Sequence, residues 1–288
     1  MPDPASCRSV ISALIGKRIL VTGGSMGLGQ AVARHLATAG ARVMIAGRSA
    51  TALDAALAEL EGAGHERLRL DVSSAAAWPE AMARLDAGGA LDGLVTAAGV
   101  LGPIGRLDEV AMDEFAATIA INLFGTALAL HHCLPRLRAA AGRAVTFSGG
   151  GGTGPLPRYD AYAASKAAVV RLTENLAAGA EIEINAVAPG FVATRMHSGT
   201  LRAGPEAAGQ SYYERTQERL REGGFPPSEA AELVAFLLSP DATGISGRLI
   251  SAQWDPWREE EFRQRLRTDS DLAKLRRIDE QFFTQAPG

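Results

Sequence analysis

Residues 18–29 read RILVTGGSMGLG, and this stretch decides the fold. Its first five residues, Arg18–Thr22, are mostly aliphatic or β-branched and predict a buried strand. The glycines that follow permit a tight turn, and the apolar periodicity of residues 28–39, ended by Gly40, predicts a helix. A strand that enters a helix through a glycine-rich turn is typical of the first unit of a dinucleotide-binding α/β sheet.

The remaining sequence repeats this alternation of short apolar runs and longer Ala/Leu-rich stretches. Further strands are predicted at residues 42–46, 67–72, 91–97, 143–148, 182–188 and 248–251, and further helices at 50–60, 75–85, 112–137 and 161–177. Strands joined through helices of this length pair in parallel, and their continuous apolar character indicates helices on both faces. The sequence therefore predicts an α/β protein with a Rossmann-like doubly wound parallel sheet of about seven strands in a single domain.

Composition narrows the class of partner. The chain has 288 residues, of which 47% are hydrophobic, and its formal net charge is -3, so no basic field is available for nucleic acid. The two cysteines, Cys7 and Cys133, are too few for a disulfide framework or a zinc cluster. The N-terminus does not resemble a signal peptide, and no apolar run approaches the roughly 18 residues of a membrane span. We expect a cytoplasmic protein with no membrane partner.

Three regions are expected along the chain. Residues 1–14 form an N-terminal extension, residues 15–252 a nucleotide-binding domain, and residues 253–288 a charged C-terminal extension. Within the domain, residues 190–227 are rich in Gly, Pro, Arg and Glu and predict an inserted helical lid. The charge runs of the C-terminal extension indicate a solvated helix face, whereas Trp254 and Trp257 are typical of an interface or a pocket rim.

The glycine-rich turn predicts which ligand binds. Its spacing, Gly23-x-x-x-Gly27-x-Gly29, has one residue more than the six-residue dinucleotide fingerprint and lacks the Lys-Ser/Thr pair of a phosphate-transferring loop. The end of the second strand, residues 46–49, offers no carboxylate for a ribose diol. It offers Arg48, whose guanidinium suits a 2′-phosphate, so NADP(H) is expected rather than NAD(H). The alternative is that Arg48 is an ordinary surface arginine.

The predicted third strand ends at Asp71-Val72. A carboxylate at the carboxyl end of a strand could accept a hydrogen bond from an adenine amino group. It could equally cap the next helix, although Ser73 and Ser74 are also suitable caps. Both interpretations stay open.

Tyr162 and Lys166 lie one helical turn apart, so their side chains are expected on the same face. A neighbouring ammonium group favours the phenolate and would lower the tyrosine pKa, as a general acid/base requires. Alone, such a pair is commonly a surface packing contact.

Ser148 ends the fifth strand at the ligand-binding edge, before a loop with five glycines at residues 149–157. Asn122 interrupts an apolar helical run, where it either serves this site or caps a neighbouring turn in the core.

Several motifs occur in order: Thr22-Gly23-x-x-x-Gly27-x-Gly29, Asp71-Val72, Asn122, Ser148, Tyr162-x-x-x-Lys166 and Pro189-Gly190-x-x-x-Thr194. Together they resemble the short-chain dehydrogenase/reductase family of the classical type, over about residues 15–252. The resemblance implies an NAD(P)(H)-dependent oxidoreductase that interconverts a ketone and a secondary alcohol. It also implies a homo-oligomer, often a homotetramer, built on the two long helices.

The resemblance implies a role for each matching residue. Tyr162 would be the proton donor or acceptor, and Lys166 would lower its pKa and bind the nicotinamide ribose. Ser148 would hold the substrate oxygen, and Asn122 would position a water in a proton relay behind Lys166. The implied cofactor contacts, besides Tyr162 and Lys166, are Gly23, Ser25, Met26, Gly27, Leu28, Gly29, Arg48, Asp71, Val72, Ala98, Gly99, Pro189, Gly190, Val192 and Thr194. No metal is expected.

The sequence departs from the family pattern at residues 96–99, where Thr96-Ala97-Ala98-Gly99 replaces Asn-Asn-Ala-Gly. Ala97 therefore lacks the amide that normally braces the central sheet, which puts local stability in doubt more than catalysis. The loop at residues 149–157 is also long and glycine-rich for the family. It is therefore expected to reshape the substrate pocket.

The substrate pocket is expected under residues 190–227, with Tyr212, Tyr213 and Phe225 as walls. Arg195, Arg202 and His197 could meet an acidic or polyhydroxy substrate, or simply be solvated. The substrate is thus a small carbonyl or alcohol compound, polar or cyclic.

Three other functions remain as alternatives. The first is a non-catalytic dinucleotide-binding regulator or scaffold on the same fold. The second is a nucleotide-sugar epimerase or dehydratase, but such chains have a different glycine spacing and a larger C-terminal domain. The third is a metal hydrolase, but the adjacent His131 and His132 face different directions on a helix and cannot share a metal as residues four apart would.

Overall fold

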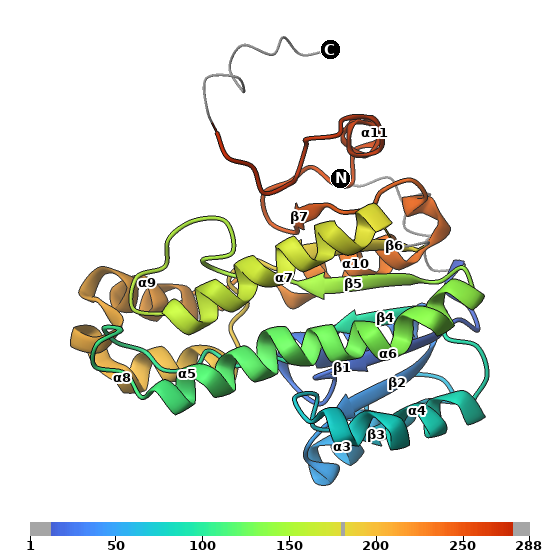
Figure 1. Ribbon diagram of the computed structural model, residues 1–288, viewed down its shortest axis with the longest axis horizontal. Coiled ribbons are helices and arrows are strands. Elements are labelled where there is room, and N and C mark those ends of the chain that lie inside the picture. Colours follow the sequence, from blue (N-terminus) through green and yellow to red (C-terminus); the bar gives the residue numbers. More distant parts are fainter. Residues whose placement is uncertain (1–12, 180–181, 279–288) are drawn as a thin grey trace.

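A computed structural model of the protein describes residues 13–179 and 182–278. Its centre is one seven-stranded sheet with all strands parallel, in the order β3-β2-β1-β4-β5-β6-β7 (Figure 1). The strands are β1 Arg18–Thr22, β2 Arg42–Gly47, β3 Glu66–Arg69, β4 Gly93–Thr96, β5 Arg143–Phe147, β6 Glu183–Ala188 and β7 Leu249–Ser251. The strand order reverses between β1 and β4, which is where doubly wound sheets bind ligands. The predicted fold class is confirmed.

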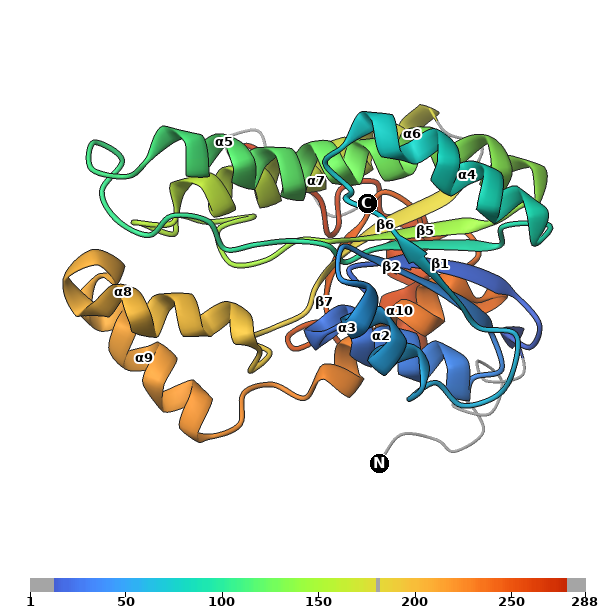
Figure 2. The same ribbon diagram turned by 90° about the horizontal axis from the view of Figure 1, so that it is seen from below.

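Helices cover both faces of the sheet. One face carries α2 (Gly27–Thr38), α3 (Ala50–Leu57) and α10 (Pro227–Leu238). The other carries α4 (Trp78–Ala87), α6 (Gly125–Ala139) and α7 (Asp160–Gly179), and α5 (Met112–Ile119) precedes α6. Figure 2 shows the two helical layers on opposite sides of the strands. This three-layer arrangement leaves the carboxyl ends of the strands as the edge where loops can form a site.

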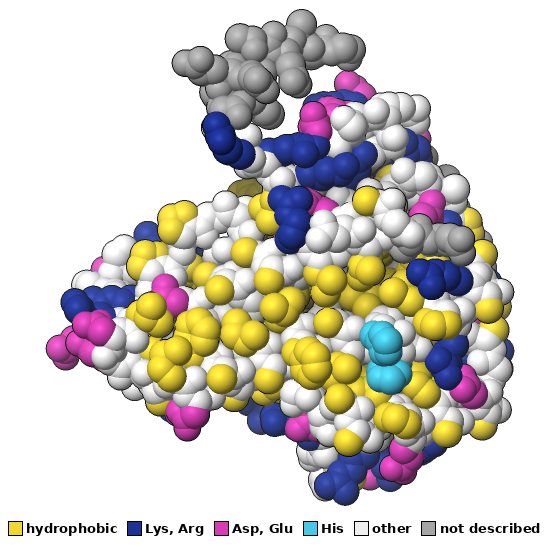
Figure 3. Space-filling view, in the orientation of Figure 1, with side chains coloured by type: hydrophobic (Ala, Val, Ile, Leu, Met, Phe, Trp, Pro, Cys, Tyr) yellow, Lys and Arg dark blue, Asp and Glu magenta, His cyan; other side chains and the backbone are white. Residues whose placement is uncertain are grey.

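One helical stretch has an exposed apolar face as well as a core face. Among the described residues, Met112–Ala139 is long and apolar enough to cross a membrane by length and composition, with a mean hydropathy of 1.4, so the expectation that no apolar run reaches this length is wrong. Of the most apolar part of this stretch, 44% is buried inside the protein, and Leu130, Cys133 and Leu137 belong to the core. Apolar side chains gather over α5, α6 and α7 (Figure 3). The stretch therefore belongs to the packed fold and presents an apolar surface.

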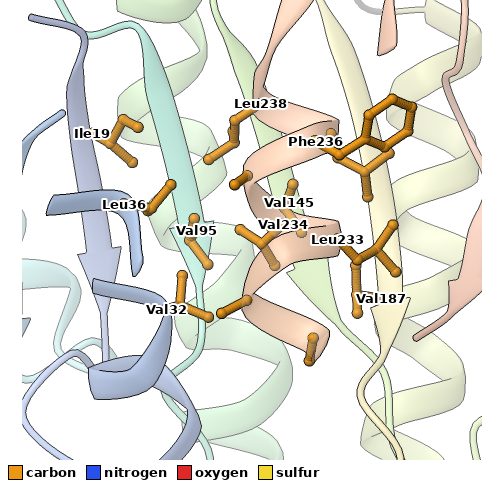
Figure 4. Packing of buried hydrophobic residues seen from close by; sticks show 14 of the residues in the cluster. Ile19, Val32, Leu36, Val95, Val145, Val187, Leu233, Val234, Phe236 and Leu238 are labelled. Atoms are coloured by element: carbon orange, nitrogen blue, oxygen red, sulfur yellow. The ribbon is translucent and has the colours of Figure 1, made fainter. Parts of the chain in front are cut away.

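The core on the α2 and α10 face follows from the alternation of side chains along each strand. Ile19 and Val21 of β1 point to this face, whereas Leu20 belongs to the opposite cluster. Val32 and Leu36 of α2 and Leu233 and Val234 of α10 pack over the strand residues (Figure 4). Each fully buried aliphatic side chain stabilises the fold by about 1.5–3 kcal/mol. This packing fixes the positions of the strand ends that carry the site.

Two predicted elements differ from the structure in detail. The strand predicted at 67–72 pairs with β2 only over Glu66–Arg69, because β2 itself ends at Gly47. Leu70 and Val72 are nevertheless buried, which explains why the apolar pattern continues beyond the strand. The helix predicted at 112–137 is helical throughout but contains a π-helical turn at Ala120–Phe124, between α5 and α6.

Residues 190–227 are largely helical, as predicted. A 3₁₀ turn, Arg195–His197, leads into α8 (Ser198–Ala208), and α9 (Gln210–Arg221) follows. Inside α8, Gly204 has φ +77°, a conformation that favours glycine and interrupts the helix. Both helices lie at the end of the molecule where α5 and the start of α7 are found (Figures 1 and 2).

The described part of the C-terminal region packs onto the domain. Helix α11 (Glu260–Thr268) exposes its glutamates, as predicted for a solvated face, but buries Phe262 and Leu266. Of the two tryptophans, Trp257 is buried in the core and Trp254 is exposed. Almost all of the predicted N-terminal extension, residues 1–14, lies outside the described residues, which begin at residue 13. Cys7 also lies outside them.

Candidate active site

The glycine turn after β1 forms a cradle without side chains. Gly23 and Gly27 have φ values of +69° and +56°, which glycine adopts readily. A Cβ on Gly23 would lie 2.6 Å from the Ala98 nitrogen, and one on Gly27 would lie 3.4 Å from Thr194 Cγ2. The turn, the segment after β4 and the segment after β6 therefore meet at one edge, as the predicted cofactor contacts require.

Helix α2 begins at this cradle with its amide groups free of a side-chain cap. Met26 at the N-cap makes no side-chain capping hydrogen bond, and the first turn carries no acidic residue. Unpaired N–H groups and the positive end of the helix dipole favour an anion at this place. The backbone here thus fits the pyrophosphate of a dinucleotide.

Arg48 and Asp71 lie close to each other beside the cradle. Arg48 is exposed, and its guanidinium contributes to lowering the pKa of the Asp71 carboxyl. The larger cause is a hydrogen bond from the Ser73 hydroxyl, and the Ser73 amide donates to the same oxygen at 3.0 Å. Asp71 therefore caps its own turn, and it lies beyond the end of β3 rather than on it.

Tyr162 and Lys166 lie on the same side of α7, as their spacing predicts. Lys166 Nζ is 5.7 Å from the centroid of the Tyr162 ring and donates to the Phe147 carbonyl oxygen at 3.1 Å. Our prediction of a lowered tyrosine pKa is wrong for the protein alone. Burial is the main cause that raises the pKa of Tyr162, and burial lowers the pKa of Lys166 to about 8. Both desolvated groups thus favour their neutral forms.

Ser148 and the loop after it surround the Tyr162 hydroxyl. Ser148 is buried directly after β5, and its amide donates to the Val187 carbonyl at 2.9 Å. A Cβ on Gly149 would overlap the Tyr162 hydroxyl, and a Cβ on Gly152 would overlap Ser148 Oγ. The glycine-rich loop is therefore required for the backbone to pass this close to both hydroxyl groups.

Asn122 is fully buried in the π-helical turn and ties three elements together. Its side-chain oxygen accepts from the Val100 amide at 2.8 Å, and its Nδ2 donates to the Val100 carbonyl at 2.9 Å. Nδ2 also donates to Ser165 Oγ at 3.0 Å. The side chain thus acts as a buried brace between the segment after β4 and α7. Between Asn122 and Lys166 lies Gly99, where a Cβ would be 3.3 Å from Asn122 Oδ1 and 3.7 Å from Lys166 Nζ.

Ser165 belongs to this group of residues although the sequence motifs did not single it out. It is fully buried, and its hydroxyl donates to the Tyr162 carbonyl at 2.7 Å while accepting from Asn122. The available signal was a lone hydroxyl on an otherwise Ala-rich helix face, three residues after Tyr162. Ser165 links the Asn122 brace to the helical turn that carries Tyr162.

The departure at residues 96–99 leaves one polar atom without a partner among the described residues. Thr96 Oγ1 is buried and makes no hydrogen bond there, and Ala97 contributes only a methyl group, 3.3 Å from the place of a Cβ on Gly29. The small side chain lets the glycine turn approach β4 closely. The unpaired hydroxyl belongs to Thr96, and the cost to local stability expected from the missing amide at Ala97 stays a prediction.

His131 and His132 do not form a metal site with other described residues. Their rings meet edge to face at 4.9 Å, and His132 stacks on Trp78. Among residues 13–179 and 182–278, no group of three or more His, Cys, Asp or Glu side chains is placed to hold a metal ion. His132 therefore has a packing role against α4.

A glycine cradle at the switch point of a parallel sheet, with a tyrosine and a lysine at the same edge, defines a dinucleotide-dependent oxidoreductase. A family model described as Enoyl-(Acyl carrier protein) reductase matches residues 23–253. The chain is 30% identical over 245 residues to dehydrogenase/reductase SDR family member 2, mitochondrial, of Homo sapiens, covering 83% of this chain and 85% of that protein. The chain belongs to the short-chain dehydrogenase/reductase family, whose members act on alcohols and ketones with a nicotinamide dinucleotide.

Relatives with different substrates are similarly close. The chain is 34% identical over 249 residues to galactitol 2-dehydrogenase (L-tagatose-forming) of Cereibacter sphaeroides, covering 83% of this chain and 94% of that protein. It is 36% identical over 242 residues to cis-4-hydroxycyclohexanecarboxylate dehydrogenase of Sinomonas cyclohexanicum, covering 81% of this chain and 93% of that protein. A crystal structure of actinorhodin polyketide ketoreductase with NADPH matches with a TM-score of 0.73 and 29% identity, covering 82% of this chain and 96% of that one.

Proposed function

We propose that the protein is an NADP(H)-dependent oxidoreductase that interconverts a ketone and a secondary alcohol, with Tyr162 as general acid/base. The observation that carries this proposal is the placement of Lys166 Nζ 5.7 Å from the Tyr162 ring, at the same sheet edge as Ser148 and the glycine cradle. The reduced nicotinamide, when bound, supplies a hydride to the carbonyl carbon. Gly23, Gly27, Ala98 and Thr194 would hold the dinucleotide there.

The chain's own residues then handle the carbonyl oxygen. Ser148 Oγ and the Tyr162 hydroxyl would both donate hydrogen bonds to this oxygen, and Tyr162 would give up its proton as negative charge develops. Since the pKa of Tyr162 is raised by burial, the phenol holds its proton at neutral pH and can act as donor in the reduction direction. Lys166 would stabilise the phenolate that results, and the Asn122–Ser165 brace would hold the turn of α7 in place.

The experiment measures ketone reduction by the loss of NADPH absorbance. Tyr162→Phe removes the proton donor, so kcat should fall by at least about 100-fold. NADPH binding, followed by fluorescence, should stay nearly unchanged because the ring remains. Thr268→Val, which removes an exposed hydroxyl at the end of α11, serves as the control and should keep kcat. A Tyr162→Phe protein that turns over at the wild-type rate would contradict the proposal.

The non-catalytic alternative predicts a different result. A regulator or scaffold on this fold would bind NADPH but reduce no member of a broad panel of ketones. The enzyme is favoured because the family's four catalytic positions are all occupied by matching residues, which are Asn122, Ser148, Tyr162 and Lys166.

A homo-oligomer, the cytoplasmic location and the lack of a nucleic-acid partner stay predictions. The names of the relatives include both polyol and cyclic-alcohol dehydrogenases, so the substrate class needs a separate argument.

A further inference from the structure

Tyr162 belongs to an apolar cluster. Its buried members are Leu101, Tyr159, Tyr162 and Ala208, and its half-buried members are Ile104, Leu156, Met196, Tyr212 and Tyr213. They come from the segment after β4, the loop after β5 and the segment of residues 190–227. Three separate parts of the chain thus place hydrocarbon and aromatic surface next to Tyr162, the residue that would meet the substrate.

Tyr159 fixes Tyr212 in this cluster. The Tyr159 hydroxyl donates to Thr200 Oγ1 of α8 at 3.0 Å, and both residues are fully buried. The rings of Tyr159 and Tyr212 lie 4.9 Å apart at an angle of 53°, which is a favourable tilted contact. The polar atoms of Tyr159 and Thr200 satisfy each other, so α8 and α9 are held against the start of α7 with the Tyr212 ring in the cluster.

Three cations of residues 190–227 make contacts outside this cluster. Arg195 reaches Met26 of the glycine turn, with 3.9 Å between its Nη2 and the sulfur. His197 stacks on Phe191 at 3.9 Å, and the Arg219 guanidinium lies 5.4 Å from the same ring. Arg195 and His197, which were expected to meet a polar substrate, thus have partners of their own. Burial raises the pKa of Tyr212, and the nearby Arg219 and Arg215 oppose this shift, so these two cations lie at the outer side of the cluster member Tyr212 rather than free of it.

We propose that the substrate is a ketone carried on a compact apolar ring, and that Tyr212 selects it against open-chain polyhydroxy ketones. This inference rests on the proposed function and concerns the same site. A ring of hydrocarbon can pack against Leu101, Leu156 and the Tyr212 ring. The several hydroxyl groups of a polyhydroxy ketone would be desolvated beside this largely apolar surface, which offers few polar atoms. Ser148 and Tyr162 serve the one carbonyl oxygen.

The test compares 4-methylcyclohexanone with erythrulose, which have the same number of non-hydrogen atoms and one ketone each. With NADPH in excess, kcat/KM should be at least about 100-fold higher for the cyclic ketone. Isothermal titration calorimetry of each ketone into the protein with bound NADP⁺ gives a second readout that needs no turnover. The cyclic ketone should bind more tightly in this measurement as well.

Variants of Tyr212 test the selection itself. Tyr212→Ala should raise KM for 4-methylcyclohexanone by about tenfold or more with a smaller change in kcat, and Tyr212→Phe should keep the wild-type KM. Glu218→Ala, an exposed position on α9, is the matched control, and NADPH binding with a thermal melt shows that each variant is folded.

The outcomes separate the two proposals. Preference for erythrulose, or an unchanged KM in Tyr212→Ala, overturns the inference while the proposed function stands. If no ketone of the broad panel is reduced but the cyclic ketone binds in a Tyr212-dependent way, the proposed function fails, and the selectivity of the site for a compact apolar ring is still supported. Loss of binding selectivity in calorimetry overturns the inference whatever the turnover.

Discussion

Tyr162 and Lys166 share one environment, and at the residue scale that environment controls their protonation. In water, an ammonium group beside a phenol favours the phenolate. Here both groups are desolvated, and burial is the main cause of both pKa shifts. In the protein alone the phenol therefore keeps its proton at neutral pH, whereas the amine, with a pKa of about 8, is still charged and destabilised by its burial. Proximity was readable from the spacing, whereas the direction of the pKa shift was not, because burial depends on the loop after β5 and on the packing of α7.

The buried amine makes stability depend on pH. Lys166 has a pKa of about 8 in the folded chain and 10.5 in the reference state, so the unfolded chain binds more protons between these values. The free energy of unfolding should therefore rise with pH in this window, by about 2 kcal/mol from pH 8 to pH 10. Below pH 8 the buried amine is charged, and the full cost of burying that charge lowers the free energy of unfolding. Urea unfolding of wild type and Lys166→Met measures this contribution as the pH dependence of their difference.

The raised pKa of Tyr162 acts in the opposite direction, and above its ordinary value of 10. There the unfolded phenol loses its proton first, so stability falls with pH. Measurements kept at or below pH 10 thus report mainly on Lys166. Parallel curves for wild type and Lys166→Met would show that the amine is not desolvated as described.

Arg48 tests cofactor choice at the same scale. Its guanidinium is exposed beside the turn that holds Asp71, where a 2′-phosphate could lie. Arg48→Ala should lower kcat/KM for NADPH by about tenfold, with little change for NADH, because a charge-assisted pair with phosphate is lost. Arg69→Ala, on the exposed edge of β3, is the control. Equal or better use of NADH by the unmodified protein would reject the preference.

At the scale of elements, the order of strands and helices follows from the sequence, whereas the local hydrogen bonding does not. The β1 boundaries agree with the prediction because the run Arg18–Thr22 ends at a glycine. The π-helical turn at Ala120–Phe124 has no sequence signature. It holds Asn122, whose amide bonds to Val100, a residue of another segment. Such a turn is set by tertiary contacts rather than by propensity.

The C-terminal helix shows the same limit. Charge runs predicted a solvated face, which is correct for Glu259, Glu260 and Glu261, but the opposite face belongs to the core. Arg263 lies over the Phe236 ring at 4.3 Å, so even a cation of this helix covers apolar surface. A short helix with two apolar residues gives too weak a periodic signal to reveal this packing.

Helix α11 should consequently contribute to the stability of the whole domain. Phe262→Ala removes a buried ring from the core next to α10 and should lower the free energy of unfolding by about 3 kcal/mol. Glu261→Ala, its exposed neighbour, should change it by less than about 0.5 kcal/mol. Urea denaturation compares the two. Similar values for both variants would mean that α11 is not an integral part of the core.

At the scale of the whole molecule, the apolar surface of α5, α6 and α7 is the place where we expect a second copy to bind (Figure 3). Phe124 is 48% exposed on this stretch. Phe124→Asp should shift a homo-oligomer towards monomer, because a carboxylate would be desolvated in the interface. Light scattering after size exclusion measures the mass. Ile15→Asp, an exposed apolar residue near β1, is the control, and a monomeric wild type would contradict the prediction.

The two edges of the sheet restrict how copies of the chain can associate. On one side, the Leu249 amide of β7 donates to the Ala273 carbonyl of the C-terminal region at 2.7 Å. On the other, β3 has only four residues, and three of them are charged: Glu66, Arg67 and Arg69. In the part of the chain that the structure describes, neither border therefore offers a long apolar row of free amides and carbonyls. A growing fibril would therefore find a poor template at these strands, and we expect association through side chains on helices.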